Sequence, residues 1–323
     1  MRTNSEQHQY LTCPDVSICI ATCNQIRYIT QCIESVLTQT GNFSWELLVG
    51  DDCSDDGTSE EISRLLATLS HATHIRHAPR KGASANMQFL FAHARGRYVA
   101  HLDGDDYWLP GKLKQQVEFM EHHPQCVAVY TNALVVDDHG TVKAIFNDAG
   151  DCFVDLNTLL NRGNFLNNSS MMLRREQLSA FNSIDRPFLD FEGHLLHARA
   201  GLLGHIGEPL VAYRANAQGS LVATANERTR EMYFQAIAGV KPGEVPPTTL
   251  TRAFADFLRR VLFRALRTRD PHLFIHWWRK VCTHTSVSRS HLAMATARAF
   301  MDELIRQVTD RVRNRKPPIL YRS

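Results

Sequence analysis

The sequence predicts an α/β protein, a mostly parallel mixed sheet flanked by helices and followed by a helical C-terminal region. Short apolar, β-branched runs alternate with stretches of helical periodicity over the first 130 residues, which favours a sheet covered on both faces. Residues 241–247 are rich in Pro and Gly, so we place a boundary there. We expect an α/β domain over residues 12–240 and an Arg-rich helical region over residues 248–323.

The expected elements follow from the spacing of apolar residues. Buried strands are predicted at residues 16–21, 45–50, 74–77, 98–102 and 127–130, with helices at residues 28–38, 85–94, 113–120 and 188–200. Thr58, with Glu61 three residues later, predicts a capping box at the start of one further helix. Residues 137–140 (DDHG) predict a hairpin turn.

Composition is that of a globular protein, with 44% hydrophobic and 21% charged residues in 323. No apolar run reaches the roughly 18 residues of a membrane-spanning helix, and the polar first ten residues lack a signal-peptide pattern. The eight cysteines form no C-x-x-C pair. We therefore expect a cytoplasmic protein with buried free thiols.

Charge is unevenly distributed. Residues 251–323 hold 16 basic and 5 acidic residues, whereas the preceding part of the chain is net acidic. A basic region of this kind suits an anionic surface such as lipid head groups, and it equally suits a solvated helical face.

Three expected strands end in polar clusters, which are Thr22 with Asn24, Asp51 with Asp52, and the run Asp103-Gly104-Asp105-Asp106. Ligands of parallel sheets bind at the carboxyl ends of the strands. Three carboxylates in four residues repel one another, and a divalent cation that holds a diphosphate would compensate them. The alternative is an acidic surface turn.

The stretches SICIATCNQ, LLVGDDCSDDGT and YVAHLDGDDYWLPGKL occur in this order between residues 16 and 116. Together they resemble the nucleotide-binding half of family 2 glycosyltransferases, which have the GT-A fold. The resemblance implies a nucleotide-binding half over residues 12–130 and an acceptor half over residues 131–240. It weakens after Tyr130, returns at residues 165–174 and 188–220, and does not extend to residues 245–323.

The resemblance also implies roles for individual residues. Ala21, Thr22 and Asn24 would lie against the nucleotide base, with Lys81 near the base and phosphates. Asp52 would accept a hydrogen bond from the uracil imide, a donor that cytosine lacks, so UDP is favoured. Asp103 would lie near the ribose. The residues implied to hold Mn²⁺ or Mg²⁺ are Asp103, Asp105, Asp106 and Asn216, the last in place of a family histidine.

Asp190 occupies the position of the family's general base, with Glu192 as the fallback. The competing interpretation is that Asp190 only caps a helix, for which Asp is a favoured residue. His194 and His197 follow one helical turn apart and are interpreted as core or acceptor-lining residues.

These assignments predict an inverting transfer of a sugar from a UDP-sugar donor to a hydroxyl of a glycan or lipid-linked acceptor, with Asp190 as base and a metal ion at the diphosphate. One rival is a nucleotide-sugar hydrolase or nucleotidyltransferase. Another is a non-catalytic adaptor that senses nucleotide-sugar and binds membrane or nucleic acid through its basic tail. Nucleic acid is not the partner we favour, and a homo-oligomer is a further expectation.

Phe254, Phe257, Leu258 and Val261 form an apolar stripe at helical spacing within the basic region. We expect this stripe to pack on the protein, the arginines beside it to face anionic lipid, and Trp277 and Trp278 to lie at the membrane boundary. Peripheral association with the inner face of the membrane would follow.

Overall fold

The computed structural model describes residues 13–215, 227–285, 287–313 and 318–321. In this part of the chain the strands form one mixed sheet with the path β11-β7-β6-β9-β4-β1-β2-β3, and β10 pairs with β5, β6 and β8. The strands are β1 (Val16–Thr22), β2 (Trp45–Asp51), β3 (Ala72–Arg76), β4 (Tyr98–Asp103), β5 (Tyr107–Trp108), β6 (Cys126–Val136), β7 (Val142–Asn147), β8 (Cys152–Val154), β9 (Met172–Arg174), β10 (Leu202–Arg214) and β11 (Ile319–Tyr321).

The four strands β3, β2, β1 and β4 run parallel, as the alternating sequence pattern predicts. Ala21 of β1 pairs with Gly50 on one side and with Asp103 on the other. The three polar clusters therefore leave the sheet at the same edge. Beyond β4, β9 is antiparallel to both β4 and β6, and β10 runs parallel to β6.

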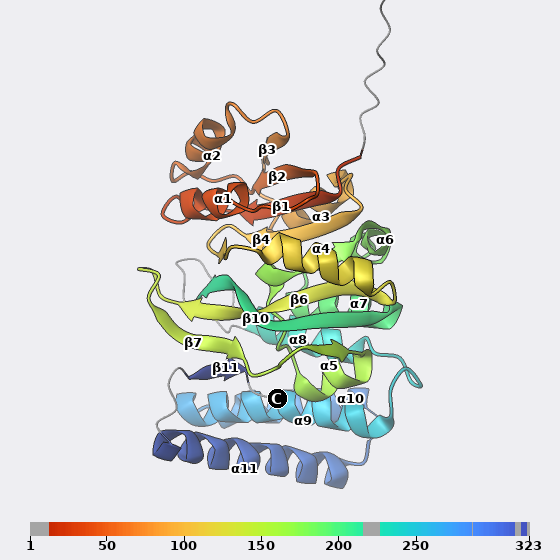
Figure 1. Cartoon of the computed structure of the whole chain (residues 1–323). Helices are drawn as coiled ribbons and strands as arrows, with labels where there is room; N and C mark the ends of the chain where they lie inside the picture. The colour runs from red at the N-terminus through yellow and green to blue at the C-terminus, as the bar shows by residue number, and fades with distance from the viewer. Residues whose placement is uncertain (1–12, 216–226, 286, 314–317, 322–323) are drawn as a thin grey trace, which may run out of the picture.

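Helices cover the sheet on its faces and at one end (Figure 1). The helices of the α/β part are α1 (Ile29–Leu37), α2 (Thr58–Leu66), α3 (Ala83–His93), α4 (Lys112–His122), α5 (Leu156–Arg162), α6 (Leu178–Asn182) and α7 (Asp190–Ala200). Two short 3₁₀ turns, η1 (Asn168–Ser170) and η2 (Arg175–Gln177), flank β9.

Two local expectations differ from the structure. The capping box does not form, because Thr58 already lies inside α2 and Gly57 precedes it with a left-handed φ of 96°. The Asp56 carboxylate accepts the Thr58 N–H instead, and Glu61 contacts Thr30 and Arg64. The strand expected at residues 127–130 extends from Cys126 to Val136, because β6 has partners along its whole length.

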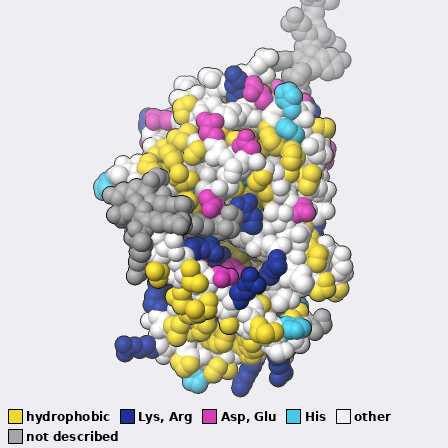
Figure 2. All heavy atoms as spheres, turned by 60° about the horizontal axis from the view of Figure 1, so that its bottom comes forward, with side chains coloured by type: hydrophobic (Ala, Val, Ile, Leu, Met, Phe, Trp, Pro, Cys, Tyr) yellow, Lys and Arg dark blue, Asp and Glu magenta, His cyan; other side chains and the backbone are white. Residues whose placement is uncertain are grey.

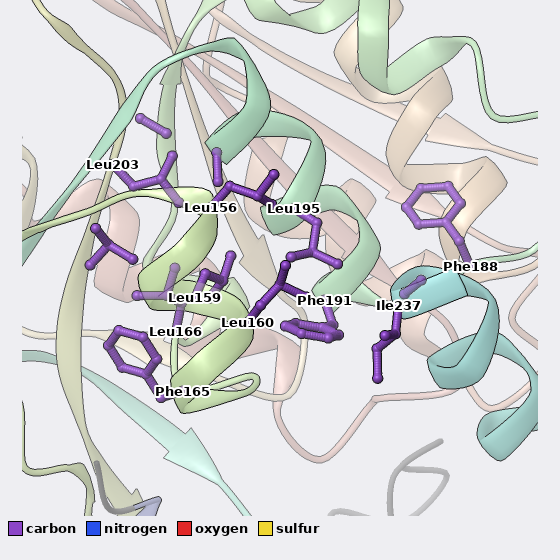
Figure 3. Packing of buried hydrophobic residues seen from close by; sticks show 14 of the residues in the cluster. Leu156, Leu159, Leu160, Phe165, Leu166, Phe188, Phe191, Leu195, Leu203 and Ile237 are labelled. Atoms are coloured by element: carbon purple, nitrogen blue, oxygen red, sulfur yellow. The ribbon is translucent and has the colours of Figure 1, made fainter. Parts of the chain in front are cut away.

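The core beneath the acceptor half is built by α5 and α7 (Figure 3). Leu159 and Leu160 of α5 belong to the same buried cluster as Phe191 and Leu195 of α7. Phe191 is 1% exposed and directly follows Asp190. Its burial fixes the first turn of α7, and with it the position of the Asp190 carboxylate.

Four further helices complete the fold, α8 (Glu227–Ala238), α9 (Pro247–Thr268), α10 (Pro271–His284) and α11 (Arg289–Arg313). In Figure 1, α9 and α11 lie side by side at the end of the molecule opposite α2. The apolar stripe of α9 packs into the protein, as expected, with Phe254, Phe257 and Leu258 buried.

The expectation that Trp277 lies at a membrane boundary is wrong. Its side chain is 0% exposed and contacts the rings of Phe257 and Phe234. Trp278 is only partly buried and also packs on the core. In the described residues, no helix combines the length and apolar character needed to cross a membrane.

Candidate active site

A cleft of about 520 Å³ opens at the carboxyl ends of the parallel strands. One end is lined by the polar clusters that follow β1, β2 and β4. The other end is lined by side chains from α7, α8, α9 and β11. The cleft therefore joins the predicted nucleotide-binding half to the C-terminal helices, which the sequence placed in a separate region.

The end of the cleft next to β1, β2 and β4, called the donor end below, is formed by backbone and small polar groups. Thr22 Oγ1 donates to Gln25 Oε1 over 2.7 Å. Gly104 lies against both side chains, and a Cβ added there would meet Gln25 Oε1 at 2.5 Å and Thr22 Oγ1 at 2.6 Å. Glycine is therefore required between the acids of this cluster. Ala21 and Thr22 line the cleft as the resemblance implied.

Asp52 lines the cleft and is 3% exposed. Its two carboxylate oxygens accept the backbone N–H groups of Lys81, over 2.6 Å, and Gly82, over 2.8 Å. These bonds fix the loop before α3 and hold the carboxylate in one orientation. Each oxygen retains a lone pair for a further donor, which is the capacity that a uracil imide requires.

Two residues assigned to the nucleotide do not line the cleft. Asn24 is exposed with a left-handed φ of 54°, and its side-chain oxygen accepts the Asp55 N–H over 3.0 Å. The Lys81 ammonium lies 4.3 Å from the ring centroid of Phe89 on an exposed face. Asn24 thus holds the turn after β1, and Lys81 contributes its backbone rather than its charge.

The carboxylates of the acidic cluster differ in their hydrogen-bond partners and in their burial. The Asp103 carboxylate lies 3.0 Å from His101 Nε2 and accepts a hydrogen bond from the Ser169 hydroxyl over 3.2 Å. Its side chain is 41% exposed. Asp106 is buried, and its two oxygens accept the Arg214 N–H over 2.7 Å and the Ser169 hydroxyl over 2.5 Å. Asp106 lines the cleft together with Asp103 and Asp105, but both of its oxygens are engaged in anchoring β10 and η1.

Burial and mutual repulsion govern the ionisation of this cluster. Burial, together with the charge of Asp103, raises the pKa of Asp105 to about 6. Burial, together with the charges of Asp105 and Asp103, raises the pKa of Asp106. Burial also acts to raise the pKa of Asp103, but His101, Asn168 and Ser169 outweigh it and hold this pKa below the usual value. The protein groups around Asp105 and Asp106 therefore do not fully offset burial and the repulsion between the acids.

The charge of the Arg214 guanidinium acts on this cluster and lowers the pKa of Asp105, against burial and Asp103. The Arg214 guanidinium donates to the backbone oxygen of Asp105 and to Gln31 Oε1, and lies 4.5 Å from the ring centroid of Tyr28. These contacts bridge β10 and α1 across the acidic turn. Asn216, the fourth implied metal ligand, lies outside the described residues. Among the described residues, no group of three or more His, Cys, Asp or Glu side chains is arranged to hold a metal ion, and this includes the acidic cluster.

Asp190 lines the cleft at the start of α7. Its Oδ1 accepts the Asn164 amide over 3.1 Å and the Phe191 N–H over 2.8 Å. His194 Nδ1 lies 3.1 Å from Asn164 Oδ1, and burial lowers the pKa of His194 to about 3, so a neutral imidazole orients the amide. Burial also raises the pKa of Asp190, against the effect of its two donors.

Glu192 differs from Asp190 in every relevant respect. Both of its oxygens are paired with Arg186, at 2.6 and 3.0 Å, and it does not line the cleft. The geometry therefore favours Asp190 for a role toward an acceptor. Asn164 and His194 support it from 26 and 4 residues away in sequence, and the sequence pattern around Asp190 contained no signal for Asn164.

The far end of the cleft is lined by residues that sequence reasoning did not assign to the site. Tyr233 of α8, Arg260 and Arg264 of α9, and Tyr321 of β11 all face it. The expectation that the α9 arginines face lipid is therefore wrong for Arg260 and Arg264. Their side chains follow the polar edge of the same helix whose apolar stripe is buried, and that edge faces the cleft.

A parallel sheet whose strand ends form an acidic cleft is the architecture of GT-A glycosyltransferases. Residues 17–179, just over half of the chain, match the family described as glycosyl transferase family 2. The chain belongs to that family.

Two of the relatives reported below carry glycosyltransferase names. An uncharacterized protein of Mycobacterium tuberculosis is 29% identical over 211 residues, which are 63% of this chain and 60% of the relative. The putative glycosyltransferase EpsE of Bacillus subtilis is 36% identical over 128 residues, covering 39% of this chain and 46% of EpsE. WfaP of Escherichia coli, named as a UDP-Glc:alpha-D-GlcNAc-diphosphoundecaprenol beta-1,3-glucosyltransferase, is 38% identical over 106 residues, 33% of this chain and 41% of WfaP. The chain thus spans between two fifths and three fifths of the length of these relatives.

Among solved structures, S. aureus TarS 1–349 in complex with UDP-GlcNAc superposes with a TM-score of 0.66 at 16% identity, covering 91% of this chain and 92% of TarS 1–349. The match at this identity concerns the fold, and it includes the helices that follow the α/β part.

Proposed function

We propose that the protein transfers a sugar from a UDP-sugar to a hydroxyl of a glycan or lipid-linked acceptor, with inversion at the anomeric carbon. The observation that carries this proposal is the single cleft that presents Asp52, Asp103 and Asp105 at one end and Asp190 at the other. The family supports glycosyl transfer, and the neighbour bound to UDP-GlcNAc supports a uridine diphosphate donor.

The donor end would bind UDP through its fixed polar groups. Asp52 is held by two backbone N–H groups and would accept the uracil imide N–H. Asp103 and Asp105 would hold a Mn²⁺ or Mg²⁺ ion, whose oxygen preference suits them. The repulsion between these acids supports this fit, because a divalent cation would relieve it. When bound, such an ion neutralises charge that grows on the leaving diphosphate.

Asp190 would remove the proton from the acceptor hydroxyl as its oxygen attacks the anomeric carbon, and UDP would leave from the opposite face. Oδ1 is occupied by Asn164 and Phe191, and among the described residues Oδ2 has no recorded hydrogen bond. Oδ2 is thus the oxygen available to receive the proton.

Two measurements test the proposal. UDP binding by calorimetry should require Mn²⁺ or Mg²⁺ in the wild type, and Asp105→Ala should abolish that dependence while the circular dichroism spectrum is unchanged. Equal affinity of the wild type for UDP, CDP and GDP would contradict the role of Asp52. A screen of UDP release from UDP-sugars, with and without acceptors, separates a transferase from a hydrolase, which releases UDP without acceptor, and from an adaptor, which releases none.

We also propose peripheral contact with anionic lipid at the cytoplasmic face, through the exposed side of α9 and α11. Arg267 is exposed, and Met294 and Met301 on α11 are 62% and 52% exposed. Sedimentation with vesicles of rising anionic lipid content tests this, because such binding should disappear at high salt. Protein that ignores anionic vesicles at low salt contradicts it, and a mass that rises with concentration would assign the face to a homo-oligomer instead.

A further inference from the structure

The far end of the cleft differs in charge from the donor end. The acids that line the cleft are Asp52, Asp103, Asp105, Asp106 and Asp190, whereas α9 contributes only the guanidinium groups of Arg260 and Arg264. Figure 2 shows a hollow on the face where the C-terminal helices come forward, with several Lys and Arg side chains around it. The position of two cations beyond the proposed base calls for a negatively charged occupant.

Arg260 is held in place and still has donors to offer. Its Nε donates to Asp256 Oδ2 over 2.8 Å, while Arg259 donates to Asp256 Oδ1, so one carboxylate is shared by two guanidinium groups. In the described residues no hydrogen bond is recorded for Arg260 Nη1 or Nη2, and the side chain is 41% exposed. A planar guanidinium fixed at Nε presents its remaining N–H groups as a fork that matches an oxyanion.

Arg264 follows Arg260 by one helical turn on the same side of α9. Within the described part of the chain, its guanidinium has neither an ion pair nor a hydrogen bond recorded, and it lines the cleft. Arg264 is partly exposed and lines the cleft together with Phe257 and Val261, so its guanidinium is available to an anion that enters there.

The cations lie close to the proposed reaction centre. A Cβ added at Gly163 would lie 3.5 Å from Arg260 Nη2 and 3.6 Å from the Tyr233 hydroxyl, and the next residue, Asn164, donates to Asp190. Only two adjacent residues thus separate the Arg260 fork from the carboxylate that would accept the acceptor's proton. An anion bound by Arg260 would belong to the sugar that carries the attacking hydroxyl, or to its neighbour.

We propose that Arg260 and Arg264 form an anion subsite for the acceptor, which binds a carboxylate or phosphate group on or next to the acceptor sugar. The inference rests on the proposed transferase function, since it places the acceptor at the Asp190 end. Tyr321 lines the same end and offers aromatic surface to the apolar face of a sugar ring, whereas the Tyr233 ring is stacked on Phe191. The acceptor is then an acidic glycan unit or a sugar phosphate, and a neutral sugar binds weakly.

The experiment uses the full chain and ligand-observed NMR. UDP binding with Mn²⁺ is measured first, and its absence would contradict the proposed function. Glucose 6-phosphate, glucuronate and glucose are then titrated against the UDP-saturated protein, or against nucleotide-free protein if UDP does not bind. The anionic sugars should bind about tenfold more tightly than glucose, as expected for charge-assisted hydrogen bonds. Whichever of glucose 6-phosphate and glucuronate binds more tightly shows whether the subsite recognises phosphate or carboxylate.

Variants locate the subsite. Arg264→Gln should weaken the anionic sugar about fivefold or more, and because Arg264 has no recorded protein partner among the described residues its loss should leave the fold intact. Arg260→Gln should act in the same direction. Arg267→Gln is the matched control, since Arg267 is exposed on the same helix and does not line the cleft. Equal binding of glucose and the anionic sugars, unchanged binding by Arg264→Gln, or displacement of the anionic sugar by UDP would each overturn the proposal.

Discussion

Replacing Asn164 by Leu tests the arrangement around Asp190 without changing the base itself. The Asn164 amide donates to Asp190 Oδ1 over 3.1 Å, and this donor favours the ionised carboxylate. A buried hydrogen bond to a charged group contributes about 1.5–3 kcal/mol, and the partial exposure of Asp190 argues for the lower end. About 1.4 kcal/mol corresponds to one pH unit.

The direction in which the pH–rate profile moves follows from the change in the pKa of Asp190. Burial already raises the pKa of Asp190, and loss of the amide donor raises it further. The carboxylate is the active form, so activity is present above this pKa and lost as pH falls through it. The acidic limb of the rate profile should therefore move to higher pH by about one unit in Asn164→Leu.

The assay is UDP release, measured from pH 5 to 9 with the donor and acceptor that the screen identifies. Asn161→Leu is the control, because Asn161 is exposed on α5 and bonds only to Asn157 and Arg252 among the described residues. If Asn164→Leu lowers the rate equally at every pH, Asn164 only packs against α7. If its acidic limb moves to lower pH, the assignment of Asp190 as the base is wrong.

Other predictions concern the base, its fallback and the C-terminal core. Asp190→Asn should lower transfer by about 10²-fold or more, the scale of general-base loss, with UDP affinity unchanged. Glu192→Gln should retain transfer because both oxygens of Glu192 already pair with Arg186, and an inactive Glu192→Gln beside an active Asp190→Asn would exchange their roles. Trp277→Ala should lower the free energy of unfolding by about 3–5 kcal/mol in denaturant titration, since its ring is fully buried. A change below 1 kcal/mol would place Trp277 outside the core.

The sequence predicted the parts of the fold that depend on local pattern. Apolar runs marked β1, β2 and β4, and parallel pairing brought Asp52, Asp103 and Asp105 to one edge because Ala21 pairs with both Gly50 and Asp103. The GT-A fold and the family were confirmed. The roles of the individual site residues remain predictions.

The other features of the site could not be predicted from the sequence, because they depend on contacts between residues far apart in the chain. Asn164 reaches Asp190 across 26 residues, and no local motif marks that pair. Helical periodicity showed that one side of α9 is buried, but it could not show that Arg260 beside the stripe faces a cleft rather than solvent. Lys81 was assigned from its position in a loop, whereas its ammonium lies over Phe89.

The two ends of the cleft come from different parts of the chain. Strand ends that precede residue 110 line the donor end, whereas α8, α9 and the short strand β11 line the other. Under the proposed assignment of the two ends, a change on α9 or β11 would alter acceptor binding without disturbing the groups that would hold the nucleotide.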